Sequence, residues 1–276
     1  MNPHTTYPAS LKSLFLSLYQ HRQLIKQMAW RDVIGRYKGS IMGLLWSFLT
    51  PILMLTVYTF VFSVVFKARW GGGDDESRFS FALVLFVGLI IHGLMAEVLN
   101  RAPNLILGNV NYVKKVIFPI EILPVVSFIS AFFHAFISLI VLLIALLVIN
   151  GSIHSTALLL PIILLPLAIL ILGIAWILAS LGVYVRDIGL TIGILTTVML
   201  FLSPVFFPIS ALPESQQSLL YLNPITFIII QSREVLIWGN LPDWRGLLLY
   251  TMIALPILLV GYFWFQKTRK GFADVL

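Results

Sequence analysis

Side chains that could support acid–base or metal chemistry are few and scattered in this sequence. The 276 residues contain no cysteine, and the five histidines share no metal-ligand spacing, so thiolate sites and disulfides are excluded and no metal site is expected. His92, Glu97 and His134 lie within long apolar segments, where ionisable residues are functional candidates because a charge is costly in lipid. For each of them, a packed or water-reaching position is favoured over a role in proton transfer.

Motifs for covalent or phosphate chemistry are also absent from the sequence. It contains no G-x-x-x-x-G-K-[ST] phosphate loop, no H-E-x-x-H and no G-x-S-x-G. No pair of carboxylates lies in the middle of an apolar segment at helical spacing. Residues 71–73 are glycines, but three acidic residues follow them and would repel a phosphate. The chain is therefore not predicted to be an enzyme, and no cofactor is expected on it.

The elements that carry these residues are predicted to be transmembrane helices. Hydrophobic residues make up 59% of the chain and charged residues only 11%, whereas soluble domains carry about 25% charged residues. Such a chain cannot cover its surface with polar groups, so part of its solvent must be lipid. We expect an all-α polytopic membrane protein in which residues 1–276 form one domain. Its six predicted spans are residues 41–66, 80–99, 122–149, 157–183, 188–206 and 246–266.

The basic residues predict how these spans are oriented. Most of the 18 lysines and arginines precede the first span, lie in the loops after the second and fourth spans, or follow the last span. The exceptions are Lys67, Arg69, Arg78, Arg233 and Arg245. The positive-inside rule then places both termini in the cytoplasm, in agreement with an even number of spans. Topology thus explains the net charge of +7, and no nucleic-acid partner is expected.

Three segments outside the spans are predicted to have structures of their own. Residues 10–38 place apolar side chains at i, i+3, i+4 and i+7, which predicts an amphipathic helix in the membrane interface, or else a soluble helix packed on a partner. Residues 100–121 are too polar to span and too apolar for a linker, so a short helix on the cytoplasmic surface is expected. Residues 204–243 contain five prolines, which predicts a pair of short re-entrant gate helices on the outer side.

Aromatic residues recur along the first predicted span. Tyr58, Phe62 and Phe66 are spaced by four residues, as on one face of an α-helix. Aromatic rings pack against the C–H faces of sugars, so such a column would suit a long glycan, although aromatic faces more often pack against other helices. Trp46 and Trp70 bracket the same span and are assigned to the interfacial aromatic belt.

A pattern of small residues begins the fifth predicted span. Gly189 and Gly193 form a G-x-x-x-G sequence, and glycines at this spacing let two helices approach closely. The pattern predicts helix packing, either within the chain or between two subunits.

Three stretches of the sequence are distinctive when taken together. They read WRDVIGRYKGSIMGLLWSFLTP (30–51), NVNYVKKVIFPIEILP (109–124), and LSPVFFPISALPE followed by LNPIT (202–214 and 222–226). Their order and spacing, over nearly the whole chain, resemble those of ABC-2 type permeases. Within that group they are most similar to the membrane subunits of polysaccharide exporters, the O-antigen export permeases above all.

The resemblance implies a six-span subunit that forms a homodimer and pairs with two separate ATPase subunits, which would bind the ATP and magnesium. It implies a channel in the bacterial inner (plasma) membrane for a lipid-linked polysaccharide, with membrane lipid around it. Capsule, teichoic acid or a small drug are alternative cargoes. A membrane-embedded glycolipid enzyme would need paired carboxylates or phosphate clamps, and a secondary transporter would show inverted repeats; we find neither in the sequence.

The resemblance also implies roles for particular residues. Those matching the region that docks into the ATPase are Asn109, Tyr112, Lys114, Lys115, Phe118, Pro119 and Glu121. Ile120 departs from the polar or basic residue common in the family. Those matching the external gate are Phe206, Phe207, Asn223, Pro224 and Arg233. Spans one and five would approach the dimer axis, which favours Tyr58, Phe62 and Phe66 as channel residues and Gly189 and Gly193 as dimer contacts.

Overall fold

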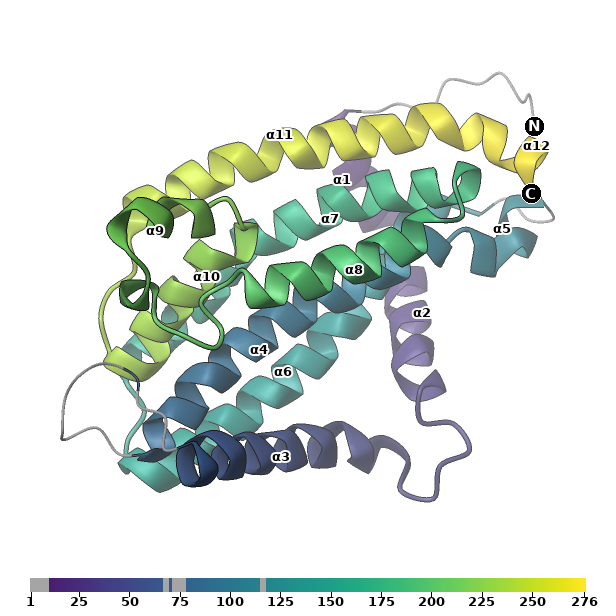
Figure 1. The fold of residues 1–276 in the computed structure, drawn as a ribbon. Helices are drawn as coiled ribbons and strands as arrows, with labels where there is room; N and C mark the ends of the chain where they lie inside the picture. Colours follow the sequence, from purple (N-terminus) through teal and green to yellow (C-terminus); the bar gives the residue numbers. More distant parts are fainter. Residues whose placement is uncertain (1–9, 67–69, 71–77, 115–117) are drawn as a thin grey trace.

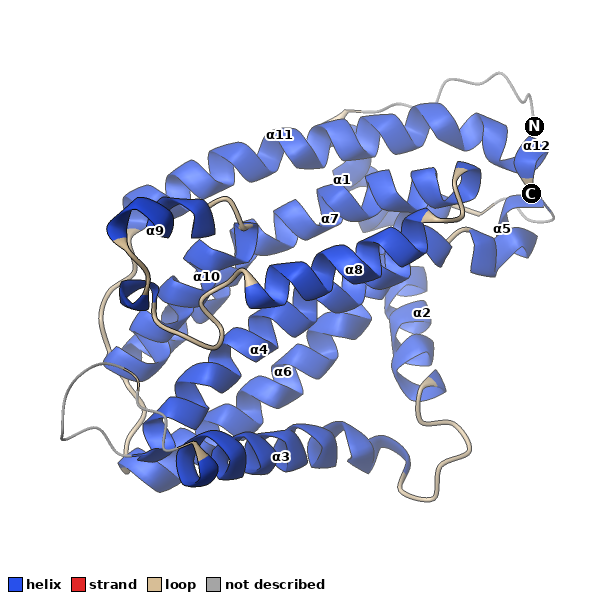
Figure 2. Cartoon of the chain, in the orientation of Figure 1, coloured by secondary structure: helices blue, strands red, loops and turns tan. Residues whose placement is uncertain are grey.

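The regular structure of this chain is helical throughout its described part. The computed structural model describes residues 10–66, 70, 78–114 and 118–276, and within them every regular element is a helix (Figure 2). Long helices lie side by side, and short helices collect at the two ends of the bundle (Figure 1).

The two ends of the bundle carry different short helices. One end holds α2 (Arg22–Gly35), α5 (Val110–Lys114) and α12 (Phe272–Val275), and the other end holds α9 (Glu214–Leu220) and α10 (Pro224–Arg233) (Figure 1). The first end thus contains the predicted interface and coupling segments, and the second contains the predicted gate segment.

Five apolar helical stretches among the described residues are long enough to cross a membrane. They contain α3 (Trp46–Tyr58), α4 (Arg78–Arg101), α6 (Leu123–Asn150), α7 (Leu160–Tyr184) and α11 (Trp244–Thr268). Large apolar side chains remain exposed along them, including Leu248, Met252 and Ile253 on α11. An apolar surface of this extent is unfavourable in water and suits lipid. The structure confirms the predicted all-α polytopic membrane protein.

The fifth predicted span is shorter in the structure than in the prediction. α8 (Ile188–Phe201) has 14 residues, or about 21 Å of helix, whereas a hydrocarbon core is about 30 Å thick. Pro204 lacks an N–H and disfavours helix at the residue before it, so residues 202–205 form turns instead. The prediction of six full-length spans is therefore not confirmed.

The predicted interface segment folds as two helices. α1 (Leu11–Gln20) begins with a capping box between Ser10 and Ser13, and His21 separates it from α2. α2 packs on α6 and runs across the long helices (Figure 1), as a helix in the plane of a membrane would. Its buried face consists of Ile25, Met28, Ala29 and Val33.

Short turns connect the helices, and two π-helical segments extend the ends of α3 and α10. The π-helical segments are Thr59–Val65 and Glu234–Trp238. The 3-10 turns are Gly43–Leu45, Ala102–Asn104, Leu107–Asn109, Ile120–Ile122, Ser155–Leu159, Ile209–Ala211 and Arg269–Gly271. The predicted coupling region thus contains several short turns and α5, where one short helix was expected.

Gly173 and Gly261 bring α7 and α11 into backbone contact. A Cβ atom on Gly261 would lie 2.1 Å from the carbonyl oxygen of Gly173, whereas one on Gly193 would meet no atom within 4 Å. One on Gly189 would meet nothing closer than 3.6 Å. This contact uses small residues as membrane helices commonly do, but at a pair that the sequence pattern did not indicate.

We expect Gly261→Ala to lower the thermal unfolding midpoint of the protein purified in detergent. The added methyl group would push α7 and α11 apart, and overpacking of this kind costs on the order of 1–3 kcal/mol. Gly93→Ala is the matched control, because a Cβ there meets nothing within 4 Å. Thermal unfolding of both variants can be followed by tryptophan fluorescence. Equal unfolding midpoints would contradict the close contact between α7 and α11.

Candidate coupling surface and outer gate

The predicted coupling residues around α5 are held by an aromatic stack. Tyr112 lies parallel to Phe118, with ring centroids 4.3 Å apart. The Tyr112 hydroxyl accepts a hydrogen bond from Nη2 of Arg31 on α2 (3.0 Å). Asn109 donates from its side chain to the Leu105 carbonyl (2.8 Å). The coupling region is therefore connected to the interface helix through Arg31.

The remaining predicted coupling residues differ in exposure. Lys114 is exposed and Pro119 is half-buried, whereas Glu121 is buried. Lys115 lies outside the described residues. Lys114 therefore lies on the surface of this chain, whereas Glu121 is enclosed within it.

Glu121 lies at the centre of a buried polar network. One carboxylate oxygen pairs with Nη1 of Arg269 (2.9 Å), and the other accepts from the Ser17 hydroxyl of α1 (3.0 Å). The Glu121 carbonyl accepts from Nε1 of Trp176 on α7 (3.0 Å), and Arg269 also donates to Gln266 (2.9 Å). Since a buried charge depends on its partners, Glu121 acts by joining α1, α7 and the end of α11 to the start of α6.

Arg233 is the most deeply buried charged side chain of the predicted gate segment, at 2% exposed. Its guanidinium donates to the carbonyl oxygens of Val84 (2.9 Å), Pro204 and Val205 (3.1 Å). It also lies over the Trp70 ring, 4.3 Å from the centroid. None of the described carboxylates pairs with it. Arginine suits this position because its planar group carries five donors, and here it joins α4, the turn after α8 and α10.

The sequence assigned Trp70 to the interfacial aromatic belt, and the structure shows that this assignment is wrong. Trp70 is buried beneath Arg233 and packs against Phe81 of α4, with ring centroids 5.6 Å apart. The sequence carried no local sign of this contact, because Arg233 is far away along the chain.

Asn223 connects two helix ends within the gate segment. Its side-chain oxygen accepts from the Ile225 N–H (3.3 Å) and so caps α10, with Pro224 as the first helical residue. Its side-chain nitrogen donates to the carbonyls of Met199 (2.8 Å) and Leu202 (2.9 Å). The last carbonyls of a helix have no partner within it, so Asn223 satisfies the end of α8 as well.

The predicted channel aromatics do not form one continuous column. Phe62 stacks on Phe81 (5.5 Å) and Phe206 (6.3 Å), and Tyr58 packs against the same cluster. Phe66 lies 5.8 Å from Phe62 but is largely exposed. The helix is π-helical from Thr59 to Val65, and its i→i+5 bonding changes which residues share a face. Phe207 follows Phe206 in the sequence, and its side chain is half-buried.

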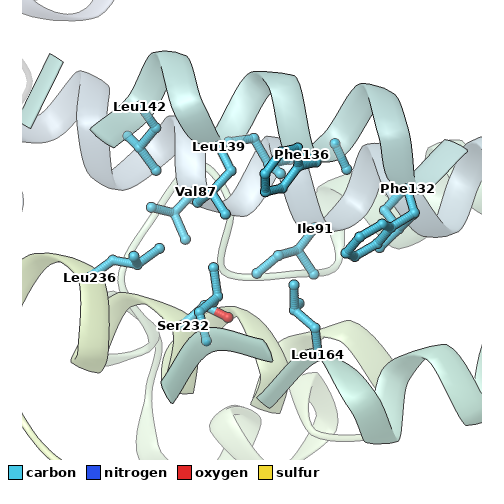
Figure 3. Close-up of a pocket in the computed structure, with 13 residues that line it drawn as sticks. Val87, Ile91, Phe132, Phe136, Leu139, Leu142, Leu164, Ser232 and Leu236 are labelled. Atoms are coloured by element: carbon cyan, nitrogen blue, oxygen red, sulfur yellow. The ribbon is translucent and has the colours of Figure 1, made fainter. Parts of the chain in front are cut away.

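A small apolar cavity lies between α4, α6, α7 and α10 (Figure 3). Its volume of about 30 Å³ has room for about one or two water molecules. Val87, Ile91, Phe136 and Leu164 line it, together with Ser232, whose hydroxyl is buried without a hydrogen-bond partner among the described residues. The cavity is too small for a sugar and offers no acid–base pair.

The fold and these contacts are those of a polytopic helical membrane protein. The described residues contain no cluster of histidine, aspartate or glutamate that could hold a metal, and their buried charges hold helices together. The family model of the ABC-2 type transporter matches residues 23–237. This range is most of the chain, and the chain belongs to that family.

Relatives of this chain align with it over nearly their full length. It is 28% identical over 268 residues to the O-antigen export system permease protein of Myxococcus xanthus, with 95% of this chain and 98% of the relative covered. An O-antigen export system permease protein of Klebsiella pneumoniae is 25% identical over 248 residues, covering 89% and 92%. The polysialic acid transport protein of Escherichia coli is 23% identical over 236 residues, covering 84% and 88%.

We expect Glu121→Ala and Arg269→Ala each to destabilise the protein by roughly 3–5 kcal/mol, because each leaves the other charge buried without its main partner. The double variant should lose clearly less than the sum of the two losses, as residues in contact do. Thermal or denaturant unfolding of the four proteins would measure the coupling. Additive losses would show that the pair does not act as a unit.

Asn223→Asp keeps the shape of the side chain but removes both donors to α8. We expect a loss of about 1–3 kcal/mol, because buried carbonyls lose their partners, together with looser packing of the gate segment. Since the chain has no cysteine, a single Phe207→Cys substitution can report opening through its rate of thiol labelling.

The matched control for this variant is Asn104→Asp, which makes the same change at an exposed asparagine. Faster labelling is expected with Asp at 223 and not with Asp at 104. Unchanged labelling and stability in the Asn223 variant would remove the proposed link between α8 and α10.

Proposed function

We propose that this chain is the membrane subunit of an ATP-driven exporter that moves a lipid-linked polysaccharide, O-antigen in the first instance, across the bacterial inner membrane. The observation that carries this proposal is the similarity over 95% of the chain to a protein named as an O-antigen export permease. The sequence has no phosphate loop, so two separate ATPase subunits would bind ATP and magnesium. Both termini of the chain would lie in the cytoplasm.

The polar networks around Glu121 and around Asn223 and Arg233 support a mechanism in which movement of the coupling region opens the gate segment. An ATPase docking at α5 and Lys114 would press on the region that ends at Glu121. The Glu121 contacts would pass this movement to α1, α7 and α11. At the far end of the bundle, Asn223 and Arg233 hold the gate segment closed through hydrogen bonds to backbone carbonyls, and the movement would open it by breaking some of these bonds.

Exposed apolar faces on α3 and α8 support a dimeric channel. Leu190 and Ile194 of α8 are 75% and 69% exposed, and Leu53 and Val57 of α3 are about half exposed. These residues follow one another at helical spacing, so each helix presents a continuous apolar stripe. In the proposed dimer these stripes meet the second copy, and Gly193 would allow close approach because a Cβ built on it meets no described atom within 4 Å.

A capsule-type polymer is the second candidate cargo. It is favoured by the similarity to the polysialic acid transport protein, which covers 84% of this chain at 23% identity. The same fold and the same coupling mechanism would serve either polymer.

Deletion of the gene in its own host tests the proposal. We expect lipid-linked polymer to accumulate inside the cell and to disappear from the surface, with recovery when the wild-type gene is returned. The polymer that accumulates identifies the cargo as O-antigen or capsule. Unchanged amounts of both O-antigen and capsule on the cell surface would contradict the proposal.

A further inference from the structure

Four charged side chains from α2, α4 and the turn after α2 form a cluster that neither the gate nor the coupling contacts use. Nη2 of Arg101 donates to both carboxylate oxygens of Asp32 (2.7 and 2.8 Å), and Arg36 pairs with Glu97. Nη1 of Arg101 lies 3.7 Å from Glu97. Nη1 is buried and makes no hydrogen bond to the described residues, so only the longer ion-pair contact with Glu97 engages it.

The cluster lines a cleft of about 690 Å³ between α2, α4, α6 and the first part of the coupling region. Arg31 is a third guanidinium on its wall, so three arginines and two carboxylates face the same space. The cleft lies where the interface helix meets the long helices (Figure 1). With α2 in the membrane interface, as the sequence predicts, the cleft beside it would lie level with the lipid headgroups.

A second groove of about 450 Å³ adjoins the cleft and shares Arg36 and Glu97 with it; its wall is mostly apolar but carries several polar side chains. It runs between α3, α4 and α6, at the depth of the membrane spans. Its polar lining includes Tyr37, Thr50, Tyr58, His92, His134 and Ser138. Polar side chains within spans are costly and are found chiefly where they face a cavity or a pathway. The groove reaches Tyr58, the first of the predicted channel aromatics.

The two histidines of this groove already have neighbours that hold them. A ring nitrogen of His92 donates to the Thr196 carbonyl (2.9 Å), and Nδ1 of His134 lies 3.3 Å from the Tyr37 hydroxyl. Nε2 of His134 is buried without a hydrogen-bond partner among the described residues. The arginines carry the positive charge of the cleft and are the groups that would attract an anion.

Asp32 keeps Arg101 in place. Burial opposes ionisation of this carboxyl, but the nearby Ser130 hydroxyl and Arg101 outweigh that effect, so the pKa of Asp32 lies below its usual value. Asp32 therefore stays ionised and occupies one edge of the guanidinium. Nη1 lies against Glu97 and is buried, so displacement of Glu97 would open it to the cleft.

Arginine is suited to phosphate because its planar group presents parallel N–H donors to two oxygens. We infer that the cleft binds the phosphorylated head of a membrane lipid, with Arg36 and Arg101 as its phosphate ligands and Glu97 as the carboxylate that the phosphate displaces. The lipid chain stays in the hydrocarbon, and a sugar attached to the phosphate points along the polar groove toward Tyr58. That the bound lipid is the exported cargo rests on the proposed function; the binding site itself does not.

The test uses the purified full-length chain in a neutral maltoside detergent. The probe is dodecyl phosphate, with inorganic phosphate as the soluble comparison, and binding is measured by titration with native mass spectrometry or the shift in thermal midpoint. Dodecyl phosphate is expected to bind at least tenfold more tightly than inorganic phosphate, because its chain adds apolar burial. Equal affinities would overturn a lipid headgroup site and indicate a site for the free anion.

Substitutions within the cluster should change the affinity in opposite directions. Arg36→Gln and Arg101→Gln each remove charge-assisted hydrogen bonds and are expected to weaken dodecyl phosphate binding about tenfold or more. Glu97→Gln removes the competing carboxylate and should tighten binding several-fold. Arg36→Lys keeps the positive charge but lacks the parallel N–H donors of a guanidinium. Its affinity for dodecyl phosphate should lie between those of the wild type and Arg36→Gln.

Arg245→Gln is the control, because Arg245 is exposed at the start of α11, away from this cleft, and it should leave binding unchanged. Unfolding midpoints without ligand show which variants are folded. If the cluster serves only to hold α2 on α4, Arg36→Gln and Glu97→Gln should weaken dodecyl phosphate binding equally. That result would overturn the inference. If binding behaves as expected but deletion leaves the surface polysaccharide intact, the site stands and the proposed cargo fails.

Discussion

A polar group inside the hydrocarbon must find its partner within the protein, and the rest of this structure depends on that requirement. At three of the breaks between helices within the bundle, a side chain supplies a missing hydrogen bond. Asn223 donates to the end of α8, Arg233 donates to the turn that follows, and Trp176 donates to the carbonyl of Glu121. The irregular segments are therefore held by specific pairs, and loss of a single donor affects a whole helix end.

These pairs lie at both ends of the bundle, and α4 connects the two ends. Near its first turns the Val84 carbonyl accepts from Arg233, and in its last turns Glu97 and Arg101 face α2. With 24 residues, α4 spans about 36 Å, roughly the thickness of the hydrocarbon core. A rigid helix of this kind can carry a displacement from the charged cleft or the coupling region to the gate segment without any long-range electrostatic effect.

The sequence predicted the fold class, and five of its six predicted spans coincide with long helices to within a few residues, because long apolar runs are a local property. It also predicted that the gate segment would be broken, because its prolines cannot continue a helix. It did not predict the length of α8, the π-helical turn after Tyr58 or the contact of Gly173 with Gly261. In each case the outcome depends on what packs against the helix, which hydropathy and spacing do not encode.

The candidate residues divide in the same way. By itself the sequence determined that this is a polytopic helical membrane protein of the ABC-2 kind without a phosphate loop, since apolar length and local motifs carry that information. Only the tertiary structure decided that Glu121 pairs with Arg269, that Arg233 binds carbonyls over Trp70, and that Arg36 and Arg101 face one cleft. These partners lie tens to more than a hundred residues apart along the chain, and the need to satisfy each buried polar group becomes specific only when the helices are packed together.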